Sequence, residues 1–298
     1  LAKGSSSTTV IFNKQLDKSK IESIEFLDYI EPSYEVVDKW DASDKKDGSV
    51  MAWTVLDEDT KLYKLYIGGI NGVVANTDSS YAFYAFTKAD SIVFNDNYDT
   101  KYATTMKGLF AGNQKLESID IDGFDTSNVT NMAAMFQSCT NLTSLNLSGF
   151  NTEKVTIMES LFYNCSKLKE LNLSNFNTSK LTSCYRMFTY CSSLVNLDLS
   201  SFDTSNVTSM AYMFAMCSNL KELNLSSFDT SNVTSMTSMF ARAAVENLDL
   251  SSFDTSKVKD MSSMFSSENW TSSTKIGNIV FGEKFNTSNV TTMSKMFY

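Results

Sequence analysis

Phenylalanines recur along the chain at a regular spacing. They fall every 26 residues from Phe124 to Phe228, then at Phe253 after a one-residue deletion and at Phe285 after an insertion. A fixed period of this length indicates a solenoid, in which each coil contacts only its neighbours. The repeat therefore outweighs the length of 298 residues, which would otherwise allow two ordinary domains.

Three apolar residues precede each of these phenylalanines in the pattern LxxLxLxxF, as in Leu142, Leu145, Leu147 and Phe150. Alternate residues of a strand share one face, so the pattern predicts a short strand with its apolar residues turned inward. The pattern extends back to Leu62 and forward to Phe281, which predicts about nine coils. Stacked as parallel strands about 4.8 Å apart, these coils would form a rod or shallow arc on the order of 40 Å long.

A polar segment follows each phenylalanine, usually Asp or Asn, then Thr, then Ser. Such short side chains bond nearby backbone amides, which predicts a turn and the start of a helix. Val129, Met132, Met135 and Phe136 then follow at spacings of three, three and one, which places them on one face of a short helix. The predicted fold class is therefore α/β, a solenoid of parallel short strands, polar turns and short helical segments.

The composition argues against catalysis and against nucleic-acid binding. The chain has no histidine, which removes the commonest general base and zinc ligand. Acidic residues at repeat positions exchange with Asn, which cannot replace a catalytic carboxylate. The net charge is -9 and no cluster of basic residues is interleaved with aromatic ones, so we expect no nucleic-acid partner. No run of 18 apolar residues is present, so we expect no insertion into a membrane. From the missing histidine and the exchangeable acidic residues, we expect a protein that is not an enzyme and has no cofactor.

The five cysteines follow the repeat. Cys139, Cys165, Cys191 and Cys217 hold the same position in successive coils, and Cys184 stands where other coils have Met. We interpret them as small buried packing residues. Stacking would bring neighbouring cysteines within disulfide range, yet an even packing column gives no reason to pair, so we expect free thiols.

A second repeated column lies between the two inward leucines of each strand and is expected to face outward. Its members are Asp120, Asn146, Asn172, Asp198, Asn224 and Asp249. The column could be a ligand or calcium surface, or a polar ladder that keeps the strand face hydrated and hydrogen-bonded along the stack. Neither DIDGFDTSN nor DASDKKDG has the spacing of oxygen ligands in a calcium loop, so we expect no metal.

The motif FDTSNVTSMxxMFxxCxxLxxLxL resembles the 26-residue repeat of bacterial surface proteins, a BspA-like variety of leucine-rich repeat. The resemblance covers about residues 60–298. It implies an N-terminal cap over residues 1–60, a leucine-rich-repeat-like solenoid over 61–298, and an extracellular or cell-surface protein without enzymatic activity. Because a solenoid normally ends in a polar cap, we expect further coils or an anchor after Tyr298.

The coils differ most on the surface of the predicted helical segments. Large side chains gather there in consecutive coils, namely Tyr163, Tyr185, Arg186, Tyr190, Tyr212 and Met216. Tyr and Arg are frequent anchors of interfaces, although ordinary surface tyrosines, or rings folded between coils, would give the same pattern. The resemblance implies adhesion, so we expect a partner site here for a protein or glycan of a host or neighbouring cell. The alternatives are a passive spacer that displays another domain and a glycan-binding surface module.

Overall fold

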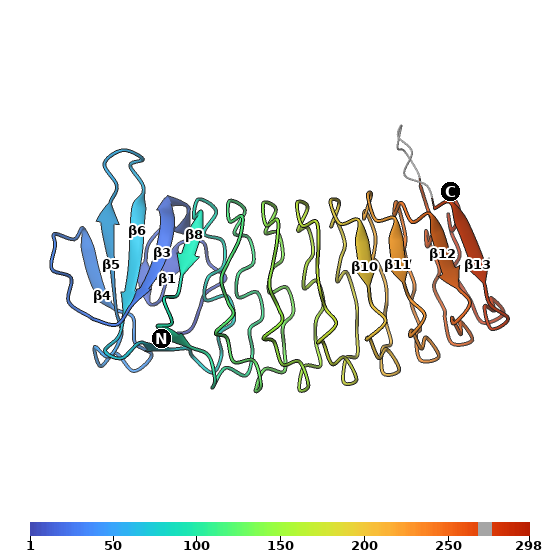
Figure 1. Ribbon diagram of the computed structural model, residues 1–298, viewed down its shortest axis with the longest axis horizontal. Helices are drawn as coiled ribbons and strands as arrows, with labels where there is room; N and C mark the ends of the chain where they lie inside the picture. Colours follow the sequence, from blue (N-terminus) through green and yellow to red (C-terminus); the bar gives the residue numbers. More distant parts are fainter. Residues whose placement is uncertain (268–275) are drawn as a thin grey trace.

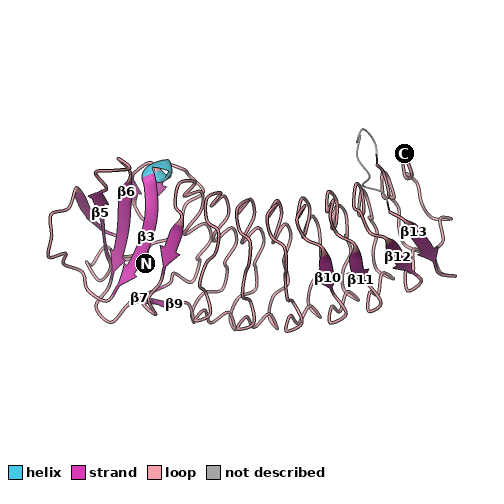
Figure 2. Cartoon of the chain, turned by 45° about the horizontal axis from the view of Figure 1, so that its top comes forward, coloured by secondary structure: helices cyan, strands magenta, loops and turns pink. Residues whose placement is uncertain are grey.

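Coils follow one another in a single row along the longest axis of the molecule, from an N-terminal sheet to the C-terminal coils (Figures 1 and 2). The computed structural model describes residues 1–267 and 276–298. The strands in this part of the chain are β1 (Val10–Ile11), β2 (Lys14–Gln15), β3 (Ile21–Leu27), β4 (Asp38–Asp41), β5 (Met51–Leu56), β6 (Tyr63–Gly68), β7 (Val73–Val74), β8 (Ser91–Val93), β9 (Tyr98–Asp99), β10 (Asn196–Asp198), β11 (Glu222–Asn224), β12 (Asn247–Leu250) and β13 (Asn278–Phe281).

The N-terminal end is closed by a five-stranded sheet in the order β4-β5-β6-β3-β8. β5 runs antiparallel to β4 and β6, whereas β3 runs parallel to both β6 and β8. Apolar residues align across these strands, because Ile24 of β3 lies opposite both Leu65 and Ile92. Strand β3 thus stands between two strands that the repeat pattern predicts as neighbours. The sheet interleaves residues from both sides of position 60, and the cap boundary there stays a prediction.

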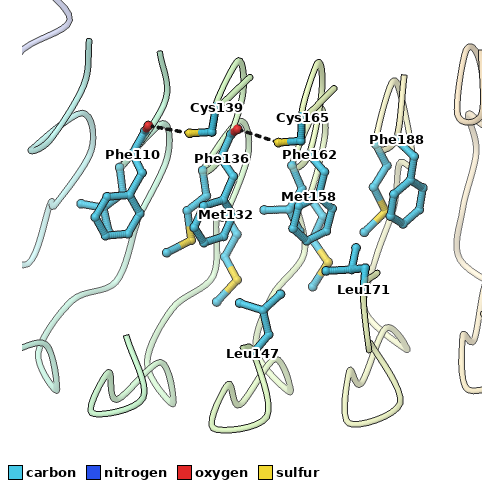
Figure 3. Packing of buried hydrophobic residues seen from close by; sticks show 14 of the residues in the cluster. Phe110, Met132, Phe136, Cys139, Leu147, Met158, Phe162, Cys165, Leu171 and Phe188 are labelled. Carbon is cyan, nitrogen blue, oxygen red and sulfur yellow. Dashed lines mark hydrogen bonds between the residues drawn. The ribbon is translucent and has the colours of Figure 1, made fainter. Parts of the chain in front are cut away.

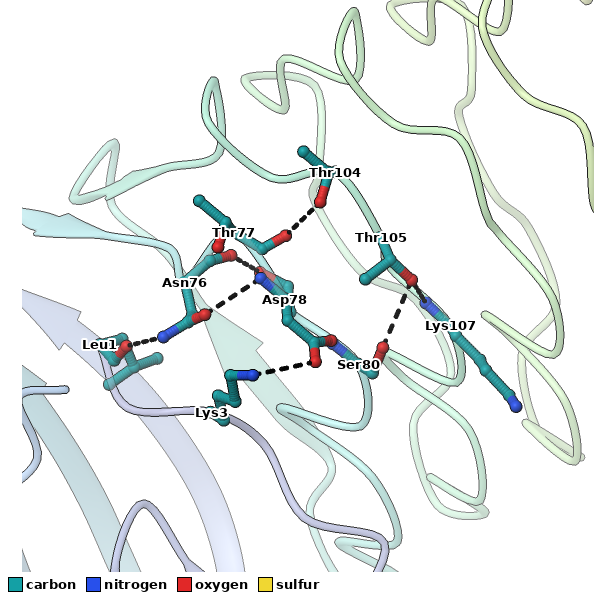
Figure 4. Close-up of polar contacts among 10 residues, drawn as sticks. Leu1, Lys3, Asn76, Thr77, Asp78, Ser80, Thr104, Thr105 and Lys107 are labelled. Atoms are coloured by element: carbon teal, nitrogen blue, oxygen red, sulfur yellow. Dashed lines mark hydrogen bonds and ion pairs between the residues drawn. The ribbon is translucent and has the colours of Figure 1, made fainter.

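The N-terminal residues also contact the side of the stack (Figure 4). The Lys3 ammonium lies 3.5 Å from the Asp78 carboxylate, and the Asn76 amide donates to the carbonyl of Leu1 over 3.2 Å. In the same view, the Thr104 hydroxyl donates to the Thr77 carbonyl over 3.0 Å. This last bond is the first of a column of exposed threonine bonds between coils, which continues from Thr130 to Thr234.

A ladder of phenylalanine rings forms the centre of the core (Figure 3). The rings of Phe110, Phe136, Phe162 and Phe188 stack with centroids 5.7 to 5.9 Å apart and planes within 16° of parallel. The ladder continues to Phe265 with the same geometry. This buried column and the parallel strand pairs establish a solenoid-like repeat structure.

The prediction of a helix in each coil, and with it the α/β class, is wrong. Among the described residues the single helix is the 3-10 turn η1 (Lys18–Lys20). The segment after Val129 is instead a run of tight turns, with the Met135 and Gln137 amides bonded to carbonyls three residues back. The intervening amides of Ala134, Phe136 and Ser138 donate to carbonyls of the next coil.

Each amide is therefore satisfied either within its turn or across the stack, which makes a helix unnecessary. Tight turns and a helix compress the chain similarly, so Met132, Met135 and Phe136 still reach one core. These turns require left-handed backbone at two residues per coil, as at Ala134 (φ 57°) and Ser138 (φ 59°).

The predicted strands are confirmed in part. β10 and β11 pair in parallel with Leu197 opposite Leu223, and β12 pairs with β13 with Leu248 opposite Ile279. In the middle coils, residues 116–121, 142–147 and 168–173 carry the same apolar pattern but are not strands. Single amide bonds join these segments, from Thr143 to Glu117 and from Lys169 to Thr143, which is too few to define a ladder.

The threonine of each polar segment has a structural role that the predicted helix start does not describe. Thr126 is buried, and its hydroxyl both donates to the Asn151 carbonyl over 2.9 Å and accepts from the Asn151 amide over 2.8 Å. The preceding Asp125 accepts from the Ser127 amide over 2.9 Å, which confirms the predicted turn. The bond from the threonine hydroxyl to a carbonyl of the next coil recurs through the stack at Thr152, Thr178, Thr204, Thr230 and Thr255.

The prediction of buried, unpaired cysteines is confirmed, since all five are free thiols inside the core. Cys139 and Cys165 donate through Sγ to the carbonyls of Phe110 and Phe136 in the preceding coil, over 3.2 and 3.1 Å (Figure 3). The cysteine column therefore joins neighbouring coils by hydrogen bonds as well as by packing.

Candidate binding surface

The six large residues singled out in the sequence lie together on the turn side of the stack, and we call them the tyrosine–arginine surface. Its members are Tyr163, Tyr185, Arg186, Tyr190, Tyr212 and Met216. The turn segments project two left-handed residues per coil, and four of the six stand at such positions, with φ of 56° at Arg186, 63° at Tyr190, 61° at Tyr212 and 62° at Met216. In an earlier coil the equivalent residues are Gly108 and Gly112.

Ring and cation contacts hold the surface together across coils. Tyr163 and Tyr190 meet edge to face with centroids 5.8 Å apart, and Tyr185 and Tyr212 do so at 6.1 Å. The Arg186 guanidinium lies 4.9, 5.2 and 6.0 Å from the ring centroids of Tyr185, Tyr212 and Tyr163. Distances of this size are those of cation–π contacts, so Arg186 occupies the centre of an aromatic cluster.

The tyrosine rings are not enclosed between coils. Tyr190 is 41% exposed, and Tyr163, Tyr185 and Tyr212 are partly buried. The exposed ring of Tyr190 is open to a partner, while the partial burial of the other three rings fits their contacts between coils. Their role in binding stays a prediction.

A groove of about 340 Å³ opens beside these residues. It is lined by Tyr163, Arg186, Thr189, Tyr190, Tyr212, Ala215, Met216, Ser238, Ala241, Arg242, Ser263 and Ser266. Arg242 lies here because it also stands at a left-handed position, with φ of 58°, and its Nη1 is 3.8 Å from the Met216 sulfur.

Arg242 and the serines of the groove were missed from the sequence. The available signal was the rarity of arginine, because Arg186 and Arg242 are the two arginines among 25 basic residues. Arg186 is the first left-handed residue of its coil, and Arg242 is the second left-handed residue of a coil further along the stack. These positions can be recognised only once the turns are known.

The outward column of Asp and Asn serves the turns that follow the strands. Asp198 accepts from the Ser200 amide over 2.9 Å and Asp249 from the Ser251 amide over 2.8 Å. Hydrogen bonds lower the pKa of both carboxyl groups, because they stabilise the charged form: for Asp198 the backbone amide of Ser200 and then its side chain, and for Asp249 the side chain of Ser251 and then its backbone amide. These side chains are thus engaged with the backbone of their own turns. Between coils, the Asn224 amide donates to the Asp198 carboxylate over 3.3 Å, as the polar-ladder interpretation expects.

Within residues 1–267 and 276–298, no three Cys, Asp or Glu side chains converge as metal ligands would. In the same ranges, no helix has the length and apolar character needed to cross a membrane.

Comparison with known proteins identifies the repeats. A family model described as "Mycoplasma protein of unknown function, DUF285" matches residues 77–197 and again residues 182–298. Comparison with curated proteins and with solved structures found no match. The two matched segments span more than half of the chain and coincide with the repeated coils. The chain therefore belongs to the DUF285 family, of which it carries two copies.

Proposed function

We propose that the protein is a non-enzymatic interaction module that binds a macromolecule of a host or neighbouring cell through the tyrosine–arginine surface. Its coils are of the BspA-like leucine-rich-repeat kind, on the basis of the repeat motif, and it works outside the cell or on its surface. The observation that carries the proposal is the occupancy of left-handed backbone positions by large aromatic and cationic side chains.

Left-handed backbone disfavours residues other than glycine by about 1–2 kcal/mol each. Gly108 and Gly112 provide the residue that such a turn accepts without strain. Arg186, Tyr190 and Tyr212 have the opposite character, being large and partly exposed. Residues that strain the backbone concentrate at functional sites, and Tyr and Arg are the residue types that dominate binding energy. These facts favour recognition over architecture.

A passive spacer is the second candidate, and the plainer coils favour it. The left-handed positions hold Ala134 and Ser138 in one of them and Ser160 and Asn164 in the next. A spacer has no use for a cluster of rings in its middle coils, and it would tolerate the loss of these rings without any change in adhesion.

Adhesion of coated beads to cultured epithelial cells tests the proposal. We expect the variant Tyr185→Ala with Tyr212→Ala to adhere at least about tenfold more weakly than the parent, since two anchors of about 1–2 kcal/mol each are removed. The matched control is Tyr29→Ala with Tyr102→Ala, which removes two exposed rings that lie outside the surface and do not stand at left-handed positions, and it should adhere like the parent. Thermal melting verifies that both variants are folded.

Two results would contradict the proposal. Parent beads that adhere no better than albumin-coated beads would favour the spacer. Equal adhesion of the parent and the Tyr185–Tyr212 variant would remove the surface from any role in binding.

A further inference from the structure

Both arginines of the chain line one groove. The other 23 of the 25 basic residues are lysines, and Arg186 and Arg242 come from separate coils. The chain has a net charge of -9, yet no Asp or Glu is among the described residues that line this groove. The groove is thus a locally cationic site on an acidic protein, which favours an anionic ligand.

The guanidinium of Arg186 is held in place without an anionic partner. The faces of three tyrosine rings surround it at 4.9 to 6.0 Å. None of the ion pairs between residues that the structure describes includes Arg186. Ring faces restrain a guanidinium but leave its N–H edge able to bind a carboxylate through two parallel hydrogen bonds.

The remaining lining groups are mostly hydroxyls and aromatic rings. Ser238 and Ser263 contribute hydroxyls from two successive coils, next to the phenols of Tyr163, Tyr190 and Tyr212. Hydroxyls can both donate and accept, as the hydroxyls of a sugar require, while tyrosine rings offer flat apolar faces to the C–H groups of a pyranose. The volume of about 340 Å³ lies at the small end of ligand sites.

We infer that the groove binds the carboxylate-bearing sugar of an acidic glycan, with Arg186 as the carboxylate ligand. The inference rests on the proposed function and names the chemical class of its ligand. A sugar is favoured over an acidic peptide because hydroxyls and rings, rather than apolar pockets or an open strand edge, line the site.

Calorimetric titration of the whole chain with small acidic sugars tests the inference. The probes are the methyl glycoside of N-acetylneuraminic acid, the methyl glycoside of glucuronic acid, and the methyl ester of the first as its uncharged control. We expect saturable binding of at least one acid, with the ester at least about tenfold weaker because the charge-assisted bonds are lost. The acid that binds more tightly identifies the sialic or uronic source.

Variants assign the binding to the groove. Arg186→Ala should weaken binding of the preferred acid at least about tenfold, and Arg186→Lys by a smaller factor, because lysine retains the charge but not the planar fork. The matched control is Lys101→Ala, since Lys101 also lies over a tyrosine ring, 4.7 Å from the centroid of Tyr102. That control should bind the sugar as the parent does.

Three outcomes would overturn the inference. They are no saturable binding of either acid up to about 10 mM, equal binding by Arg186→Ala, and equal or tighter binding of a hexaglutamate peptide. The bead assay separates this failure from that of the proposed function. If the Tyr185–Tyr212 variant loses adhesion while neither acid binds, the tyrosine–arginine surface is a binding surface but its ligand is not an acidic sugar. If an acid binds while adhesion does not depend on these tyrosines, the groove is a sugar site but the proposed role of the surface in adhesion is wrong.

Discussion

Each turn segment has residues in left-handed backbone conformation at fixed positions, and the side chains at these positions form part of the surface of the stack. The turns need this conformation so that alternate amides can bond to the next coil, and the chain meets the need with glycine at Gly108 and Gly112 but with alanine at Ala134. The side chain at such a position does not enter the core, so its identity is set by strain and by function. Small residues at these positions therefore offer a direct measurement of the strain.

Replacement of Ala134 by glycine should stabilise the protein. Relief of about 1–2 kcal/mol of left-handed strain outweighs the extra chain entropy of glycine, about 0.5–1 kcal/mol, for a net gain of roughly 0.5–1 kcal/mol. Ala133, the preceding residue, does not have positive φ, so Ala133→Gly should instead lose about 0.5–1 kcal/mol. Urea unfolding measures both changes, and an Ala134 variant no more stable than the Ala133 variant would contradict the role of strain.

Each coil is hydrogen-bonded to its neighbours by two columns of threonine hydroxyls, one buried and one exposed to solvent. The hydroxyl of Thr178 is buried and bonds both the carbonyl and the amide of Asp203, over 3.0 and 2.8 Å. The hydroxyl of Thr182 lies on the surface and makes one bond of 3.4 Å to Thr156. Removal of the Thr178 hydroxyl leaves a buried amide and a buried carbonyl without a hydrogen-bond partner. Water can take the place of the Thr182 hydroxyl, because that site is exposed.

We therefore expect Thr178→Val to lower the free energy of unfolding by about 2–4 kcal/mol, because a buried amide and a buried carbonyl each lose a partner. The same change at Thr182 should cost less than about 1 kcal/mol, since water satisfies the exposed carbonyl. Valine keeps the shape of threonine in both variants. Similar losses at the two positions in chemical denaturation would show that burial of the hydroxyl is not what matters.

The sequence predicted an element correctly where a repeated residue type is compatible with a single structural role. Apolar columns of Leu, Phe, Met and Cys locate the core, and the buried state of Cys139 and Leu142 follows from their recurrence. The spacing of Met132 and Phe136 has two meanings, because a helix and a run of tight turns bring the same residues to one side. Thr126 is similarly ambiguous, since a turn, a helix cap and a buried bond between coils all use threonine.

Over the whole molecule, stacking brings together residues that are one or more periods apart. The gathering of tyrosines was predictable because each coil repeats the same geometry, and the structure places Tyr185 against Tyr212 accordingly. The groove was not predictable, because it depends on the outward direction of left-handed residues such as Arg186 and Arg242. Stacking also repeats the same buried group in successive coils, so that its effect on the free energy of unfolding adds up. The buried thiols are an example.

The free energy of unfolding should fall steeply with rising pH because five thiols are buried. Burial raises the pKa of Cys139, Cys184 and Cys191 to about 12 and that of Cys165 and Cys217 well above its ordinary value. In the unfolded chain these thiols ionise from about pH 8.5. Above that pH the unfolded state binds fewer protons than the folded state, so stability is lost as the pH rises.

Lys18 opposes this trend. Its burial lowers its pKa to about 8, so between about pH 8 and 10.4 the folded state has released a proton that the unfolded state still holds, and stability gains there. Five thiols against this amine leave a net of four protons. At about 1.36 kcal/mol for each proton and pH unit, these groups contribute a loss of about 5 kcal/mol per unit near pH 10. Tyr98, whose pKa burial also raises, adds to this loss where an unfolded tyrosine ionises, near pH 10.

Urea unfolding under reducing conditions at pH 7.5, 9 and 10 measures this slope, and two variants identify its source. Cys139→Ala with Cys191→Ala removes two of the five thiols, so the net falls from four protons to two and the slope to about half that of the parent. Lys18→Met removes the opposing group and should make the slope steeper, by about one proton. A slope that is unchanged in the cysteine variant would show that groups other than the buried thiols govern the alkaline stability of the stack.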